Sequence, residues 1–124
     1  DVSVVQAPLA ATYKLINPTI STAAGVAADL TVAIRAQDAT GAANAINFEI
    51  NNVGSSVGTT AVPVASPAIL TVSNNSTGTT GGIERVNVAT TGTNNSTLTL
   101  GTDATTLAIT GSGSNTIAVN TISG

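Results

Sequence analysis

The sequence predicts an all-β fold built from stacked strands. The main support is a set of three triplets in the last third of the 124-residue chain: Leu98-Thr99-Leu100, Leu107-Ala108-Ile109 and Ile117-Ala118-Val119. In each triplet two apolar residues flank a small or polar one, which places both apolar side chains on one face of a strand. The triplets recur about every nine or ten residues, and turn-forming Gly, Thr, Ser, Asn and Asp fill the intervals. We therefore expect a stacked-strand β-solenoid, or β-roll-like module.

The composition fits strands that are packed through small aliphatic side chains. Hydrophobic residues make up 42% of the chain, yet Tyr13 and Phe48 are the only aromatic residues. A compact globular core usually relies on aromatic rings to fill its volume, whereas Val, Ile, Leu and Thr can fill a narrow space between strands. Strands at this spacing are also typical of an immunoglobulin-like antiparallel sandwich, which stays open as the alternative.

Shorter alternating stretches predict the other strands. In chain order these are residues 1–6, 11–16, 30–36, 45–51, 68–73 and 83–89. We expect residues 21–28 to form a loop. Pro63 lacks a backbone donor, so it makes residues 61–66 an edge strand or an extended segment.

Two of these strands lie close together in the N-terminal half and suggest a hairpin. Residues 30–36 and 45–51 are joined by a turn-rich connector, so we expect them to pair as an antiparallel hairpin. Ile46, Phe48 and Ile50 would face inward. Arg35 and Glu49 would lie on the outward faces and pair with each other across the hairpin.

The polar stretch at residues 74–82 is the predicted sub-boundary of the chain. It separates a hairpin-containing part at residues 1–73 from a regular strand repeat at residues 83–124. The chain starts without Met and its last repeat stops in mid-pattern. We therefore expect residues 1–124 to be one β-rich module of a longer protein.

The charge content excludes several classes of function. Charged residues make up 7% of the chain, the net charge is −3, and the basic residues are Lys14, Arg35 and Arg85. Nucleic-acid binding requires clustered Lys and Arg, so we expect no nucleic-acid partner. No apolar run approaches the roughly 18 residues of a membrane-spanning helix, so we expect no transmembrane segment.

Catalysis has little support in the sequence. The chain contains no His and no Cys, and a nucleophile needs an activating base. The spacing of the carboxylates brings no two of them together as an acid–base pair. We therefore expect that the protein is not an enzyme.

Two segments resemble a known family. Residues 82–91 read GIERVNVATT and lead into the apolar triplets, and residues 33–52 include the texture A-Q-D-A-x-G-A-x-x-A-I-N. Both resemble repeats of bacterial surface-layer proteins, specifically the RTX-related, Thr/Ala-rich type that is exported by type I secretion. The resemblance implies a secreted protein of the bacterial cell surface that forms a two-dimensional array, with calcium driving its folding and assembly. It also implies cell-surface polysaccharide as a partner of other parts of the parent chain.

A calcium loop of that family has a degenerate counterpart in the last repeat. The RTX motif is G-G-x-G-x-D-x-(apolar)-x, in which Gly residues allow tight turns and the Asp carboxylate binds the cation. Residues 111–118 match its last eight positions, with Asn115 in place of Asp, and Asp103 lies in a looser preceding unit. Asp103 and Asn115 are therefore the candidate metal ligands. A turn without metal is the other interpretation.

The expected function is structural. A chain so poor in charge is weakly protected against self-association, so copies of itself are the expected partner. We expect a component of an extracellular self-assembling array, or surface layer, held by lattice contacts and assisted by calcium. The alternatives are a stalk or repeat module of a large adhesin, and a pilus-like filament subunit that donates residues 1–6 as a strand.

Overall fold

The structure is a computed structural model that describes residues 2–16, 31–36, 39–54, 68–74 and 82–120. Its secondary structure consists of strands, and the described residues contain no helix. The strands are β1 (Val2–Ala7), β2 (Thr12–Ile16), β3 (Thr31–Ala36), β4 (Ala45–Asn51), β5 (Ala68–Asn74), β6 (Arg85–Thr91), β7 (Thr93–Thr99), β8 (Thr106–Gly111) and β9 (Ser114–Asn120).

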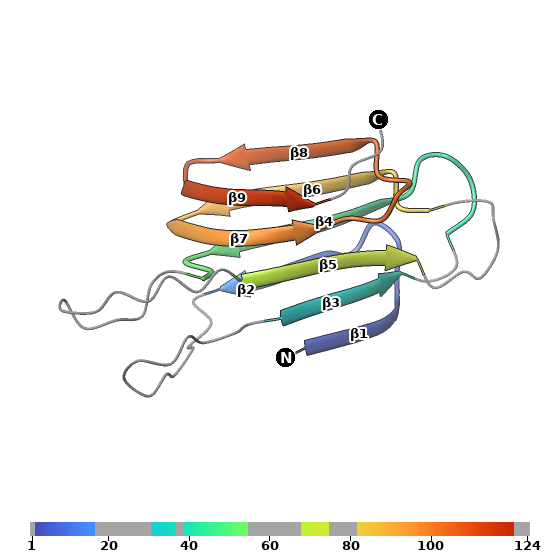
Figure 1. Cartoon of the computed structure of the whole chain (residues 1–124), viewed down its shortest axis with the longest axis horizontal. Coiled ribbons are helices and arrows are strands. Elements are labelled where there is room, and N and C mark those ends of the chain that lie inside the picture. Colours follow the sequence, from blue (N-terminus) through green and yellow to red (C-terminus); the bar gives the residue numbers. More distant parts are fainter. Residues whose placement is uncertain (1, 17–30, 37–38, 55–67, 75–81, 121–124) are drawn as a thin grey trace.

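The strands form two parallel sheets that lie face to face (Figure 1). The odd sheet has the order β1-β3-β5-β7-β9 and the even sheet has the order β2-β4-β6-β8. Every strand pair in both sheets is parallel. Consecutive strands therefore lie in opposite sheets, and the strands of the two sheets run in opposite directions, as the arrows of β8 and β9 in Figure 1 show. We call any two consecutive strands, one from each sheet, a coil, so that neighbouring coils can share a strand. The coil at the start of the stack is β1 with β2, which we call the first coil, and the coil at its other end is β8 with β9, which we call the last coil.

The predicted architecture is wrong. β3 and β4, the two strands of the expected antiparallel hairpin, belong to different sheets and pair with other strands in parallel. No antiparallel pair occurs among the described strands, which also excludes the immunoglobulin-like sandwich. The physical reason is that the connector between the two strands crosses from one sheet to the other. The inward apolar faces of β3 and β4 consequently meet across the core instead of lying side by side.

The regular β-solenoid predicted from the triplets also needs correction. After nine or ten residues the chain has passed from one sheet to the other sheet. This interval therefore does not bring the chain back to the neighbouring strand of the same sheet. Asn94 and Asn115 lie side by side in β7 and β9 and are 21 residues apart. Asn47 and Asn87 lie side by side in β4 and β6 but are 40 residues apart. The structure therefore consists of two packed parallel sheets whose coils differ in length.

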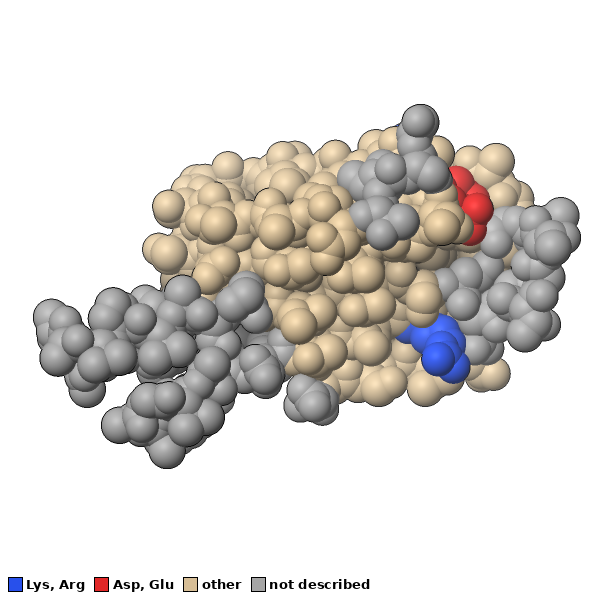
Figure 2. Space-filling view, viewed as in Figure 1, with Lys and Arg blue, Asp and Glu red and all other residues tan. Residues whose placement is uncertain are grey.

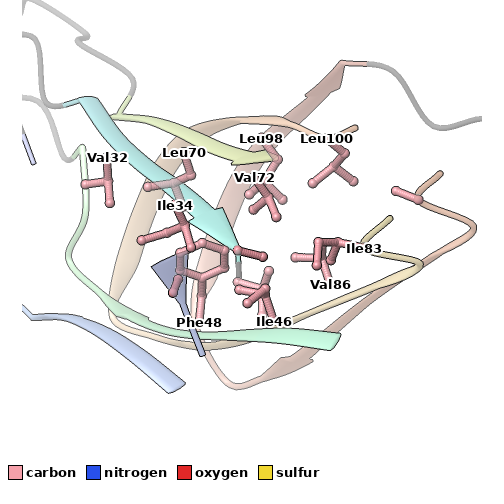
Figure 3. Close-up of a cluster of buried hydrophobic side chains, with 14 of the residues drawn as sticks. Val32, Ile34, Ile46, Phe48, Leu70, Val72, Ile83, Val86, Leu98 and Leu100 are labelled. Carbon is pink, nitrogen blue, oxygen red and sulfur yellow. The ribbon is translucent and has the colours of Figure 1, made fainter. Parts of the chain in front are cut away.

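The core lies between the two sheets (Figure 3). Because neighbouring strands pair in register, inward side chains stack in columns along the sheet, as Val32, Leu70 and Leu98 do in the odd sheet. In the even sheet Ile46, Phe48 and Ile50 face inward and are at most 2% exposed, which confirms the predicted inward face of this strand. Full burial of one such side chain contributes about 1.5–3 kcal/mol to stability, so these columns are the main source of stability.

The predicted ion pair between Arg35 and Glu49 does not form, because the two residues lie in different sheets. Glu49 pairs with Lys14 instead, its neighbour in β2, with 2.8 Å between Nζ and Oε2. The two side chains are 61% and 45% exposed. A pair this exposed contributes about 0–1 kcal/mol.

Some predicted features fall where the structure gives no description. The expected loop at residues 21–28 and the extended segment at residues 61–66 lie outside the described residues. The predicted sub-boundary at residues 74–82 is partly outside them. β4 and β6 pair along their full lengths, so the even sheet continues from one side of that sub-boundary to the other.

Candidate assembly interface

Among the described residues, no further strand covers either end of the strand stack. β1 and β2 form the first coil and have a neighbouring described strand on one side, and the same holds for β8 and β9 at the opposite end. Each of these edge strands presents a row of backbone N–H and C=O groups that no neighbouring strand in the described chain pairs. Such edges are templates for pairing with a further strand.

At the first coil the space between the sheets opens into an apolar groove of about 320 Å³. Residues of β1, β2 and β3 line it, among them the inward Val4, Tyr13 and Leu15, and Lys14 of the outward face of β2 also borders it. The Tyr13 ring packs against Phe48 with 6.2 Å between ring centroids, and its buried hydroxyl has no hydrogen-bond partner among the described residues. Burial raises the pKa of this hydroxyl above its ordinary value of 10.0. The groove is therefore the core itself, left open at this end.

At the last coil the inward side chains of β8 and β9 are only partly covered. Ile109 is 45% exposed and Val119 is 38% exposed. Their neighbours in the same columns, Val88 and Leu98, are at most 1% exposed. The last coil therefore presents core side chains to solvent.

The last coil lacks the usual protection of edge strands. Natural edges are blocked by charged residues, proline or bulges. β1 has an irregularity between Val4 and Ala7, with Gln6 at φ 58°, and Pro8 comes directly after it, while β2 carries Lys14. β8 and β9 contain no charged residue. On the face in Figure 2, charged residues form only a small blue area and a small red area.

A network of side-chain amides joins the connections at one corner of the stack. Asn94 is 1% exposed, and its Oδ1 accepts a hydrogen bond of 3.0 Å from the Val53 amide. Its Nδ2 donates to the Thr91 carbonyl at 2.9 Å and to Asn115 Oδ1 at 3.0 Å. One buried amide thus links the connections that precede β5, β7 and β9.

Asn115 uses its remaining hydrogen-bonding groups in the same network. Its Nδ2 donates to Thr90 Oγ1 at 3.0 Å and to the Gly113 carbonyl at 2.9 Å. Thr90 Oγ1 in turn donates to the Thr110 carbonyl. Gly111 has a φ of 113°, and a Cβ there would collide with the Thr90 carbonyl, so this turn requires glycine. The observed role of Asn115 is to hold a turn in place.

A second pair of asparagines stacks on the outward face of the even sheet. Asn87 Nδ2 donates to Asn47 Oδ1 at 2.8 Å, and Asn47 Nδ2 donates to the Ala10 carbonyl at 3.0 Å. This row links β6, β4 and the segment before β2. Stacked amides of this kind are typical of in-register parallel strands.

Glu84 joins the connections at the opposite ends of the even strands. Its carboxylate accepts hydrogen bonds from the Asn44 amide at 2.8 Å and from the Gly82 amide at 3.3 Å. Its backbone carbonyl accepts from the amides of Thr105 and Thr106, both at 2.9 Å. Burial alone would raise the pKa of the Glu84 carboxyl, but the hydrogen bonds outweigh burial and hold the pKa below its ordinary value of 4.5.

The structure does not bring the two predicted metal ligands together. Asp103 lies in the turn before β8, and Asn115 lies in β9, after the turn that ends β8. The six residues of β8 separate them, which corresponds to about 20 Å. In the part of the chain that the structure describes, no three His, Cys, Asp or Glu residues are grouped to hold a metal ion. The calcium site stays a prediction.

The hydrogen-bond network of Asn94 and Asn115 coincides with a repeated sequence pattern that is hard to recognise beside the apolar triplets. Gly92-Thr93-Asn94 and Gly113-Ser114-Asn115 are the same pattern, and their asparagines are 21 residues apart. This interval equals one full coil. Reading for a repeated Gly-(Ser/Thr)-Asn would have identified both the coil length and the amide pair.

Comparison with protein-family models, curated proteins and solved structures finds no match to this chain. The resemblance to surface-layer proteins therefore still rests on the short motifs at residues 82–91 and 33–52. Within the described ranges, no helix has the length and apolar character needed to cross a membrane.

Proposed function

We propose that this chain is a structural module that associates with copies of itself in an extracellular array of the surface-layer type. The observation that supports this function best is the pair of end coils, whose outer edges no other described strand covers. Each presents free strand edges together with partly exposed core side chains, and β8 and β9 carry no charge that would oppose pairing.

The polar side chains of the described residues fit a structural role. Asn94, Asn115 and Glu84 make the most extensive side-chain networks, and all three hold successive connections together. The proposal assigns the chain no catalysis. A place on the bacterial cell surface, and assembly assisted by calcium, are the parts of the proposal that rest on the family resemblance.

Sedimentation velocity across micromolar to millimolar concentrations, with and without calcium, tests the proposal. We expect association that grows with concentration and assemblies visible by negative-stain electron microscopy. Ile109→Lys places a charge on the last coil and should abolish association. Ala89→Lys places the same charge on the outward face of β6, in the middle of the stack, and should leave association unchanged.

Circular dichroism of both variants establishes that they are folded before the comparison is made. A chain that stays monomeric at every concentration, with calcium and without it, would overturn the proposal. Equal loss of association in the two variants would show that the last coil is not the contact surface. Association that depends on release of β1 from β3 would favour the filament subunit with a donated strand.

A further inference from the structure

We infer that the outward face of the even sheet carries a binding site for a small carboxylate that also bears hydroxyl groups, the chemistry of a uronic acid. The site is a partly polar pocket of about 290 Å³, located where β4, β6 and β8 begin. This inference is separate from the proposed function, because it concerns a ligand and requires no contact between copies of the chain.

The pocket forms because parallel pairing in register places the first residues of three adjacent strands in one row. Ala45 of β4 lies beside Arg85 of β6, and Arg85 lies beside Thr106 of β8. Asn87 lies two residues further along β6 and therefore on the same outward face. The remaining lining includes residues of the connections that precede these strands, among them Ala43 and Glu84.

Arg85 supplies a positive charge that no acidic side chain neutralises. It forms no ion pair within the described part of the chain, whereas Lys14 of the same sheet lies beside Glu49 and binds its carboxylate at 2.8 Å. The neighbours of Arg85 in its row are Ala45 and Thr106, which carry no charge. A guanidinium that no acid occupies can donate two parallel hydrogen bonds to the carboxylate of a ligand.

Glu84 borders the same pocket and restricts how such a ligand can be oriented. Its carboxylate accepts hydrogen bonds from the backbone amides of Asn44 and Gly82, which hold it in place. A carboxylate has room to accept further hydrogen bonds, so Glu84 can also accept one from a ligand hydroxyl. It would repel a second carboxylate placed directly against it. The ligand must therefore present its carboxylate to Arg85 and its hydroxyl groups to Glu84.

The other lining residues favour a ligand with hydroxyl groups over a bare anion. Asn87 Nδ2 donates to Asn47 Oδ1, which leaves Asn87 Oδ1 as an acceptor for a ligand hydroxyl. The Thr106 hydroxyl can both donate and accept. Ala43 and Ala45 add apolar surface against which the carbon skeleton of the ligand can pack. A bare anion would use only Arg85 among these groups.

The size of the pocket limits the ligand to a single small molecule or a single sugar unit. Its volume of about 290 Å³ lies at the lower end of the range of roughly 300–1,000 Å³ that is usual for small-molecule sites. One sugar ring with its carboxylate fits this description, and a longer stretch of polymer would extend beyond the pocket.

Titration of the isotope-labelled chain with D-glucuronate, followed by NMR, tests the site. D-glucose keeps the hydroxyl groups but lacks the carboxylate, and acetate keeps the carboxylate but lacks the hydroxyl groups. We expect glucuronate to shift the signals of the Arg85 side-chain N–H and the Thr106 amide at concentrations where glucose and acetate do not. Sedimentation velocity of the same samples records association separately, so failure of this site and failure of the proposed function are distinguishable.

Three variants assign the binding to the pocket. Arg85→Gln should weaken glucuronate binding by about tenfold or more, because it removes charge-assisted hydrogen bonds. Arg35→Gln is the matched control, since Arg35 is an exposed residue of β3 outside the pocket, and it should leave binding unchanged. Thr106→Val removes a hydroxyl at nearly the same volume and should weaken binding less than Arg85→Gln does. Circular dichroism establishes that the variants are folded.

Three results would overturn the inference. Equal binding of glucuronate and glucose would show that Arg85 does not recognise a carboxylate. Equal losses in Arg85→Gln and Arg35→Gln would show a general attraction between charges in place of a site. Signals of Arg85 and Thr106 that stay unchanged while other signals shift would place the ligand elsewhere on the chain.

Discussion

The middle and the last coil of the stack contain the same kinds of residue in very different surroundings. In the even sheet one column runs through Phe48, Val88 and Ile109, which are 1%, 1% and 45% exposed. In the odd sheet Leu98 is fully buried, while Val119 beside it is 38% exposed. All of these side chains face inward. The comparison shows that burial in this fold depends on the presence of the next coil, and that the residue type alone does not secure it.

The largest expected effect is the contrast between truncations within one column. Phe48→Ala should lower the free energy of unfolding by about 3–5 kcal/mol, because it leaves a cavity among fully buried neighbours. Ile109→Ala should cost less than about 1 kcal/mol in the unassembled chain, since its side chain is already half in solvent. Urea denaturation at low protein concentration measures both. Equal losses would contradict the distinction between the middle and the end of the stack.

The next effect compares two asparagine pairs. Asn94→Ala should lower the free energy of unfolding by about 2–3 kcal/mol, because the buried Val53 amide and the Thr91 carbonyl each lose a hydrogen bond. Asn47→Ala should cost about 0.5–1 kcal/mol, because its partners lie on the outward face where water can replace the amide. Thermal unfolding measured by circular dichroism compares the two variants. A larger loss of stability in Asn47→Ala than in Asn94→Ala would contradict the expectation that the buried Asn94 network contributes more to stability.

A smaller effect concerns acid. The pKa of Glu84 is lower in the folded chain than its ordinary value of 4.5. A lowered pKa in the folded state means that the stabilisation is fully present above pH 4.5 and is lost as the pH falls through the lower folded value. The free energy of unfolding should therefore decrease below pH 4.5, and Glu84→Gln should weaken this dependence. Denaturation at a series of pH values from neutral to acidic tests it, with Glu49→Gln as the exposed control. An unchanged profile in Glu84→Gln would argue against the role of this carboxylate.

The smallest expected effect is a gain. Ser96 lies on the inward face of β7, and its buried hydroxyl has no hydrogen-bond partner among the described residues. Ser96→Ala removes an unpaired polar group, so stability should stay the same or rise by up to about 1 kcal/mol. Thr97→Ala on the outward face provides the comparison in a denaturation series. A marked loss of stability in Ser96→Ala would mean that the hydroxyl has a partner.

Strand positions and inward faces could be predicted from the sequence, whereas strand partners could not. Alternation of apolar residues is a local property, and it correctly placed Ile46, Phe48 and Ile50 in the core. Pairing in a parallel sheet joins residues that are far apart in the chain, such as Asn47 and Asn87. No local pattern distinguishes such a partner from the next strand along the chain. The hairpin prediction therefore chose the nearest strand and was wrong.

For the candidate site too, turn residues could be recognised from the sequence, but their neighbours in space could not. The Gly-rich turn at residues 111–113 was evident from its residue types, but its comparison with a calcium loop concealed the amide pair of Asn94 and Asn115. Asp103 and Asn115 are close in the sequence, yet an intervening strand places them at opposite ends of β8. For the end coils, the sequence indicated only that few charged residues would protect them. The exposure of Ile109 could not be predicted, because it depends on whether another strand lies beside β8.

The 21-residue interval between matched positions of β7 and β9 has a consequence for how such a chain can vary in length. Duplicating or deleting one such coil would leave every remaining side chain on its original face and every ladder in register. Inserting a single residue within a strand would turn its inward side chains to solvent. Genetic variants that differ by whole coils should therefore fold alike.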